Sequence, residues 1–264
     1  MIKLLTNTQF ETVGQFDSDD NNWTIEEALL AIDLSPWEIN IGKQQLPFGK
    51  YISHFASGPM IEFGELNEKA LSVNFDVEDS FDLTTAIYFS DRTNNTHNKH
   101  GWVISFETSD AMPLSAGISY LSNLANSDRH LLIDINNGTA NKIHGLSGYI
   151  FWRNGITELS LECVAALNAY NTLDQNFNRP AALNIEFNQV ITPTLDYSLR
   201  LEGSRKLLNE PARKAGIGLN YRFNKYTVFS IEFLREKYDK PTNPINEHTH
   251  EAINSLHGQL SAAF

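Results

Sequence analysis

The sequence predicts an all-β fold, namely a transmembrane, antiparallel, up-and-down β-barrel of about fourteen strands. Three observations support this prediction. Apolar and polar residues alternate along most of the chain, the connections alternate between short and long, and the chain ends on an aromatic residue. Helical periodicity is scarce, and the longest apolar runs are far shorter than the roughly 20 residues that a spanning helix needs.

The strands are predicted from a period of two. In 37–43, Trp37, Ile39 and Ile41 share one face and polar residues occupy the other. The same alternation predicts strands at 71–77, 81–89, 102–106, 114–120, 183–187, 195–201, 215–223 and 256–264, with weaker strands near 2–13, 24–33, 145–153, 156–167 and 225–236. This pattern is typical of strands that have one apolar and one polar face.

The connections between these strands alternate in length. Short ones, with Pro, Gly, Asn, Asp or Ser at the break, lie at 34–36, 78–80, 109–113, 154–155, 190–193 and 224–225. Long ones lie at 14–22, 43–69, 90–99, 122–144, 168–180, 203–212 and 237–250. Short periplasmic turns and long extracellular loops are typical of bacterial outer-membrane barrels. We therefore expect residues 1–264 to form a single barrel domain in the outer membrane of a Gram-negative bacterium.

Aromatic residues favour this membrane barrel over a soluble β-sandwich, which is the alternative fold. They gather near strand ends, as in the interface girdles of membrane barrels. These residues are Trp37, Trp102, Tyr120, Trp152, Tyr221, Phe223 and Tyr226. The last strand places Leu256, Leu260 and Phe264 on one face, and a terminal Phe resembles the sorting signal that the barrel-assembly machinery recognises.

The composition limits the partners. Lys plus Arg is 20 and Asp plus Glu is 32, a formal net charge of -12, which argues against nucleic acid. The single cysteine, Cys163, excludes an internal disulfide and a cysteine-based zinc cluster. No secretory signal is visible, so we expect the sequence to lack the signal peptide and an N-terminal portion. The 41% hydrophobic content is expected to form a lipid-facing coat and not a hidden core.

The polar face of each strand is expected to line the lumen, because in lipid the apolar face points outward. The pore-lining candidates are the acids Glu38, Asp76, Asp82, Glu107, Glu158, Glu162, Glu186, Asp196, Glu202 and Glu232 and the bases Arg200 and Arg222, with His257 as a further titratable group. An acidic wall attracts cations, so we predict a cation-preferring channel. The alternative is that these acids only solvate a water-filled interior.

The connection 43–69 is the longest and is unusually apolar for a loop. Pro47 has no N–H to continue strand pairing, and Gly49 allows a sharp reversal. The constriction candidates are Pro47, Phe48, Gly49, Tyr51, Phe55 and Phe63. We predict that this loop folds into the barrel and narrows the pore. The alternative is that it packs over the rim or against a neighbouring subunit.

The stretch 41–50, with Leu-Pro-Phe-Gly at 46–49, resembles the phosphate-selective porins and the related LbtU-type siderophore porins of Gammaproteobacteria. The stretches 58–77, 195–203 and 215–223 look closer to the LbtU type. The resemblance implies a barrel of about sixteen strands that takes up small solutes or a siderophore. Anion selectivity is not carried over, because the predicted lumen is acidic.

Other signals are weaker. Basic residues that offer a capture site in the loops are Lys43, Lys50, Arg92, Lys99, Arg129, Lys142, Arg205, Lys206, Arg213, Arg235, Lys237 and Lys240. His248 and His250 are a loose arrangement for a metal, and Ser255 and His257 share a strand face without an evident acid partner. We therefore predict no enzyme activity, no metal site and no cofactor.

The predicted function is passive transport, with outer-membrane lipid and small solutes or a siderophore as partners. Homo-oligomerisation stays open. The alternative is a non-transporting barrel that binds partners through its loops.

Overall fold

The computed structural model describes residues 8–17, 22–77, 80–90, 99–127, 142–171, 175, 178–207, 210–238 and 252–262. The strands are β1 (Thr8–Asp17), β2 (Asn22–Leu34), β3 (Trp37–Gln45), β4 (Asn67–Val77), β5 (Phe81–Phe89), β6 (His100–Thr108), β7 (Leu114–Leu121), β8 (Gly145–Asn154), β9 (Thr157–Ala166), β10 (Ala181–Thr192), β11 (Leu195–Arg205), β12 (Arg213–Asn224), β13 (Thr227–Lys237) and β14 (Ala252–Ala262). Two short 3-10 helices, η1 (Met60–Gly64) and η3 (Leu124–Asn126), lie in connections. Within these described ranges, no helix has the length and apolarity needed to cross a membrane.

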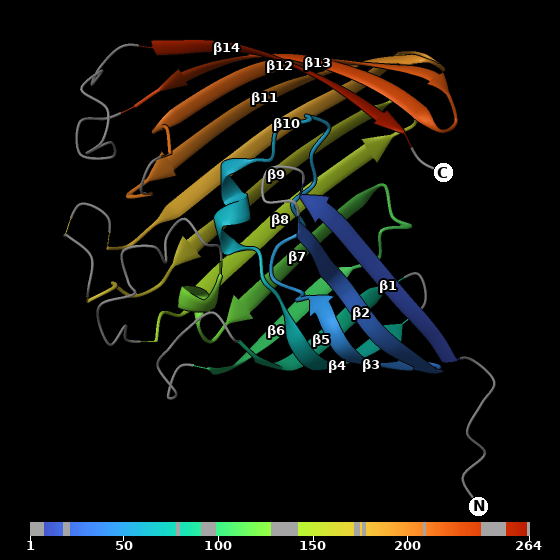
Figure 1. Ribbon diagram of the computed structural model, residues 1–264, viewed down its shortest axis with the longest axis vertical. Coiled ribbons are helices and arrows are strands. Elements are labelled where there is room, and N and C mark those ends of the chain that lie inside the picture. Colours follow the sequence, from blue (N-terminus) through green and yellow to red (C-terminus); the bar gives the residue numbers. More distant parts are fainter. Residues whose placement is uncertain are drawn as a thin grey trace, which may run out of the picture.

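All the strands belong to one sheet of 14 strands, in the order β1 to β14. Each neighbouring pair is antiparallel. Figure 1 shows the sheet curling into a wall around a central segment that carries η1. In the strand order β1 and β14 are the two ends of the sheet. The predicted all-β, up-and-down architecture is therefore confirmed.

Several strands extend beyond their alternating segments. β1 continues to Asp17 and β2 begins at Asn22, so much of the predicted connection 14–22 is strand. β12 begins at Arg213, which pairs with Lys237 at the end of β13. At the start of β12, Arg213 and Lys214 place polar residues on both faces, so alternation does not reveal this strand end, whereas the backbone pairing of the ladder continues.

The two faces of the sheet differ as the alternation predicts. On the outward face, Ile87, Leu201 and Phe223 are 62%, 60% and 60% exposed, as lipid-facing side chains are. On the inward face, Ser105 and Ser198 are buried. The wall therefore presents apolar side chains outward and polar side chains inward.

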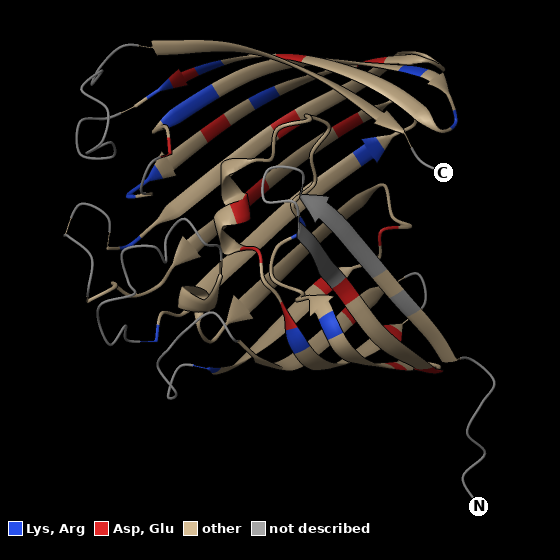
Figure 2. Ribbon diagram, viewed as in Figure 1, with Lys and Arg blue, Asp and Glu red and all other residues tan. Residues whose placement is uncertain are grey.

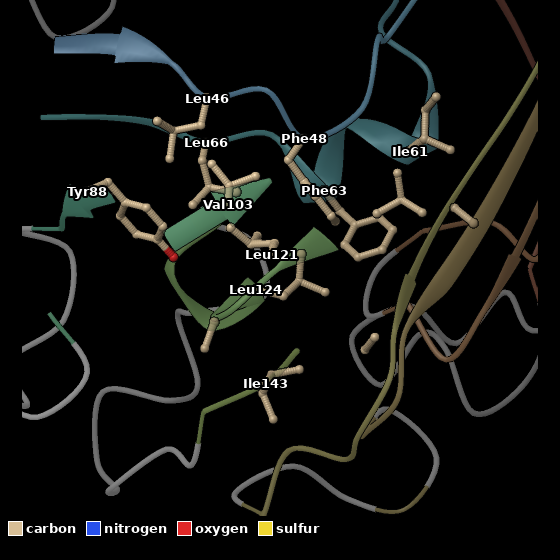
Figure 3. Close-up of a cluster of buried hydrophobic side chains, with 14 of the residues drawn as sticks. Leu46, Phe48, Ile61, Phe63, Leu66, Tyr88, Val103, Leu121, Leu124 and Ile143 are labelled. Carbon is tan, nitrogen blue, oxygen red and sulfur yellow. The ribbon is translucent and has the colours of Figure 1, made fainter. Parts of the chain in front are cut away.

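The interior also holds an apolar cluster, which corrects the expectation that the hydrophobic residues form only a lipid-facing coat. Phe48, Ile61, Leu121, Leu124 and Ile143 are each no more than 1% exposed. Figure 3 shows these side chains gathered between the connection that follows β3 and the residues around η3. The cluster forms because two connections turn apolar side chains inward, where burial removes them from water.

Candidate functional site

Residues 46–66, here called the interior segment, leave the end of β3 and return to β4 across the space that the wall encloses (Figure 1). The N–H of Leu46 donates to the carbonyl of Leu66 at 2.9 Å and joins the two ends of the segment. The residues between these two ends form hydrogen bonds with side chains of β7 and of β9 to β13, on the inward face of the wall. The segment therefore lies inside the wall.

Apolar contacts hold one half of the interior segment. Phe48 and Phe63 belong to the same buried cluster as Val103 of β6 (Figure 3). Val164 of β9 is also part of this cluster. Gly145 at the start of β8 leaves room for the Phe48 ring, because a Cβ there would lie 2.8 Å from the Phe48 Cζ. Burying a Phe side chain of this kind contributes about 1.5–3 kcal/mol from the hydrophobic effect.

Carboxylates of the wall hold the backbone of the other half. Glu162 on β9 accepts hydrogen bonds from the N–H groups of Lys50 and Tyr51 at 2.6 and 2.8 Å. Glu232 on β13 accepts from the N–H groups of Ala56 and Ser57 at 3.0 and 3.2 Å. Hydrogen bonds to a charged acceptor are stronger than neutral ones, so these two residues act as anchors.

Two further wall carboxylates bind the same backbone. Glu186 on β10 accepts a hydrogen bond from the N–H of His54, and Glu202 on β11 accepts one from the N–H of Met60 at 2.5 Å. Four of the ten predicted pore acids are thus buried against the interior segment. Their carboxylates satisfy backbone N–H groups that have no strand partner, and they do not face open solvent.

Arg200 on β11 completes this attachment. It is 1% exposed, and its Nε donates to Glu186 Oε2 at 3.0 Å while its Nη1 donates to the Ser57 carbonyl at 2.8 Å. The guanidinium also lies 4.1 Å from the centre of the Phe55 ring. A buried guanidinium requires such a complete set of partners, because desolvation of an unpaired charge is costly.

Phe55 rests on a part of β12 that carries no side chain. A Cβ at Gly216 would lie 2.8 Å from Phe55 Cε1, and one at Gly218 would lie 3.5 Å away. The alternation Gly216-Ile217-Gly218 thus leaves a shallow seat on the inward face for the aromatic ring.

The lumen holds more bases than the two arginines predicted from the sequence. Lys214 on β12 lies 3.2 Å from Glu202, and Arg222 lies 2.8 Å from Asp196. Lys214 was missed because β12 starts before its alternating segment, yet it shares the parity of Arg222.

The interior segment adds two groups of its own. Lys50 Nζ lies 3.0 Å from both Glu107 and Asp110, and His54 Nε2 lies 2.7 Å from Glu158. Burial lowers the pKa of Lys50, but the attraction of Glu107 and hydrogen bonding to Asp110 outweigh this, so the pKa is raised. The sequence placed Lys50 among the basic loop residues, but it did not predict that Lys50 lies in the lumen.

Two of the remaining predicted acids, Glu38 and Asp76, line cavities on the inner side of β3 and β4. Glu38 borders two cavities, of about 370 Å³ and 570 Å³, which also share Asn74. The smaller cavity reaches Gly49 and Lys50, and the larger one extends to Asp76 near the short turns. Among the described residues, the structure places no basic side chain in an ion pair with Glu38, Asp76 or Asp82.

The six constriction candidates all belong to the interior segment. Tyr51 has a positive φ of 52°, two residues after Gly49 with a φ of 88°, so the chain reverses sharply here. Burial raises the pKa of Tyr51 well above its ordinary value, and the neighbouring carboxylates of Glu162 and Glu65 add to this. That these residues narrow a channel stays a prediction.

Some predicted groups lie outside the described residues, namely Arg92, Arg129, Lys240, His248, His250 and Phe264. Ser255 Oγ and His257 Nε2 on β14 are 3.0 Å apart. Glu232, which pairs with His257 across the strands, already binds the interior segment. In the described part of the chain, no group of three or more His, Cys, Asp and Glu side chains is placed to hold a metal.

Neither a protein-family model nor a curated protein matches the sequence. Among solved structures, the anion-selective porin from Comamonas acidovorans is similar with a TM-score of 0.68, at 11% identity, over 97% of this chain and 84% of that one. OmpF of Salmonella typhi, in complex with daunomycin, has a TM-score of 0.63 at 11% identity, over 92% and 79%. OmpT, an outer membrane protein of Vibrio cholerae, has a TM-score of 0.58 at 11% identity, over 97% and 84%.

The chain has a porin fold. This agrees with the predicted barrel architecture. OmpT is an outer membrane protein, which agrees with the predicted location in the bacterial outer membrane. A fold shared at this level of identity does not by itself establish a function, which has to be argued from the site. The likeness extends to porins in general, so the finer resemblance to LbtU-type or phosphate-selective porins stays a prediction.

Proposed function

We propose that the protein is an outer-membrane channel for the passive diffusion of small polar solutes, narrowed by the interior segment. The observation that carries this proposal is the attachment of residues 46–66 to the inward face of β7 and β9 to β13. A segment held in this way fills part of the enclosed space and leaves a polar passage along β3 to β5. Diffusion through a water-filled passage needs no cofactor and no moving part.

The passage is proposed to prefer cations. Arg200, Lys214 and Arg222 pair with acids under or beside the interior segment, and Lys50 pairs with Glu107. The predicted pore acids that remain along β3 to β5 are Glu38, Asp76 and Asp82. Glu38 and Asp76 line the two cavities, so their field acts on solutes there. The siderophore uptake that the LbtU-type resemblance implies would have to pass this acidic wall, so a cationic or neutral solute fits it better.

The reversal potential of single channels in a KCl gradient tests this preference. Wild-type protein is expected to show cation selectivity, and the triple variant E38Q/D76N/D82N is expected to lose most of it because these wall charges are gone. R153Q, which removes a base paired with Glu158, is the matched control and should not lower the cation preference. Anion selectivity of the wild type would contradict the proposal.

The alternative is a barrel that does not transport and binds partners through its loops. Conductance in planar bilayers separates the two functions, because a non-transporting barrel gives no channel events. Folded protein that inserts without any conductance would exclude the diffusion channel.

A further inference from the structure

A basic groove lies on the outward face of the wall, at the end that carries the long connections. It has a volume of about 550 Å³ and is lined by residues of β4, β5 and β6 and by Lys142, which precedes β8. Its polar rim includes Lys69, His100 and Lys142, and its apolar floor includes Leu71, Ile87 and Trp102. The diffusion channel proposed above uses none of these residues.

Strand register places the rim and the floor in two neighbouring rows. Lys69 pairs with Phe89, and Phe89 pairs with His100. The next outward row is Leu71, Ile87 and Trp102, which are 40%, 62% and 46% exposed. Because residues two apart along a strand are separated by about 7 Å, a ligand with a charged head and an apolar tail can contact both rows.

Further positive charge surrounds the rim. Lys99 Nζ lies 5.7 Å from the centre of the Phe89 ring. Lys43 on β3 is the register partner of Lys69. In a chain of net charge -12, these basic residues make one end of the lipid-facing surface locally positive, which attracts anions.

The charge pattern of the whole wall supports this assignment. From β3 to β13, the parity of each strand places its carboxylates on the inward face. The basic residues on the outward face of these strands are Lys43, Lys69, His100, Arg205, Arg213, Arg235 and Lys237, all near the long connections. Figure 2 shows blue segments at the left-hand ends of β11 and β12.

This pattern distinguishes between two occupants of the groove. A second copy of the chain, placed beside the first in the same membrane, would bring its own basic outward residues to the same level. Like charges would then meet, which is unfavourable. A lipid phosphate carries the complementary charge, and basic pockets on membrane proteins bind such head groups.

We propose that the groove binds a phosphate-bearing lipid of the outer leaflet. The phosphate contacts Lys69, His100 and Lys142, and an acyl chain runs along Leu71, Ile87 and Trp102. Trp102 lies at the level where aromatic side chains meet lipid head groups. The phosphate brings negative charge to basic side chains that lie at the edge of the membrane, where a charge is costly to bury in lipid.

Native mass spectrometry of the folded full chain in detergent tests the proposal, with dioleoyl phosphatidic acid as the probe and dioleoyl phosphatidylcholine as the comparison. The wild type is expected to bind the phosphatidic acid more tightly. K69Q/K142Q is expected to weaken that binding about tenfold, because each basic residue near the membrane surface contributes attraction. R235Q/K237Q removes two outward basic residues of β13, which do not line the groove, and should retain wild-type affinity.

Several outcomes would overturn the proposal. Equal loss in both double variants would mean diffuse attraction, and displacement of the lipid by inorganic phosphate would mean a free-anion site. Loss of a wild-type oligomer in K69Q/K142Q alone would mean an interface between copies. As a second measurement, a phosphatidic acid with brominated chains should quench the Trp fluorescence of the wild type and quench W102F less. Equal quenching in the two proteins would place the acyl chain elsewhere.

Discussion

Gly49 sets the strictest local condition on the path of the interior segment. Its φ of 88° is rarely adopted by other residues, and a Cβ there would lie 2.7 Å from Tyr51 Cζ and 3.0 Å from Glu162 Oε1. The carboxylate that a Cβ would displace is also the acceptor for the next two N–H groups. The turn and the anchor at Glu162 therefore both require a glycine at position 49.

We predict that G49A destabilises the interior segment by about 1–3 kcal/mol, through backbone strain and displacement of the Glu162 carboxylate. The measurement is the rate of trypsin cleavage at Lys50 in folded protein, which should rise. G155A is the control, because Gly155 has a φ of 59° and a Cβ at that position would meet no atom within 4 Å. Cleavage rates that are equal in the two variants would show that Gly49 has no steric role.

At the scale of elements, the strands could be predicted from sequence because alternation reports which face meets lipid. The alternation of the residues around Leu71 and around Leu201 was enough to predict the two strands that carry them. The apolar residues of the interior segment predicted that it folds into the barrel, but not which strands it contacts. Its anchors could not, because the acceptors of the Lys50 and Ala56 N–H groups lie 112 and 176 residues away in sequence.

The same distance in sequence explains why the sequence could not distinguish the acids that line open space from those that the interior segment covers. Parity placed Glu162 and Glu232 on the inward face correctly, but it could not show that a segment covers them. An acid on the polar face of a strand can face water or bind backbone N–H groups, and the sequence pattern is the same in both cases.

Helix η1 gives the interior segment a dependence on pH. Burial raises the pKa of Glu62 to about 7; Glu65 and Glu202 add to the rise, and Arg200 and Lys214 oppose it. Since the folded segment favours the neutral carboxyl, this contribution to stability is complete below pH 4.5 and is lost as the pH rises through about 7. We predict faster trypsin cleavage at Lys50 relative to an unfolded reference substrate at about pH 8.5 than at about pH 5.5, on either side of this pKa. In E62Q this difference should largely disappear, and its persistence would assign the pH effect to another group.

At the scale of the whole molecule, the wall separates its charges by face. Carboxylates such as Glu162 point inward, where they hold the interior segment or line the passage, and outward bases such as Lys69 lie near the long connections. The net charge of -12 therefore does not describe a uniform surface. One face is suited to small polar solutes and the other to lipid.

The central claim is that the interior segment narrows a diffusion channel. The most direct test is the single-channel conductance in symmetric KCl of a variant in which residues 51–62 are replaced by a short Gly-Ser connector. This replacement removes Phe55 and the N–H groups that Glu186, Glu202 and Glu232 bind, so the segment no longer fills the interior. We predict a conductance at least about twofold higher than that of the wild type. A folded variant with unchanged conductance would contradict the account.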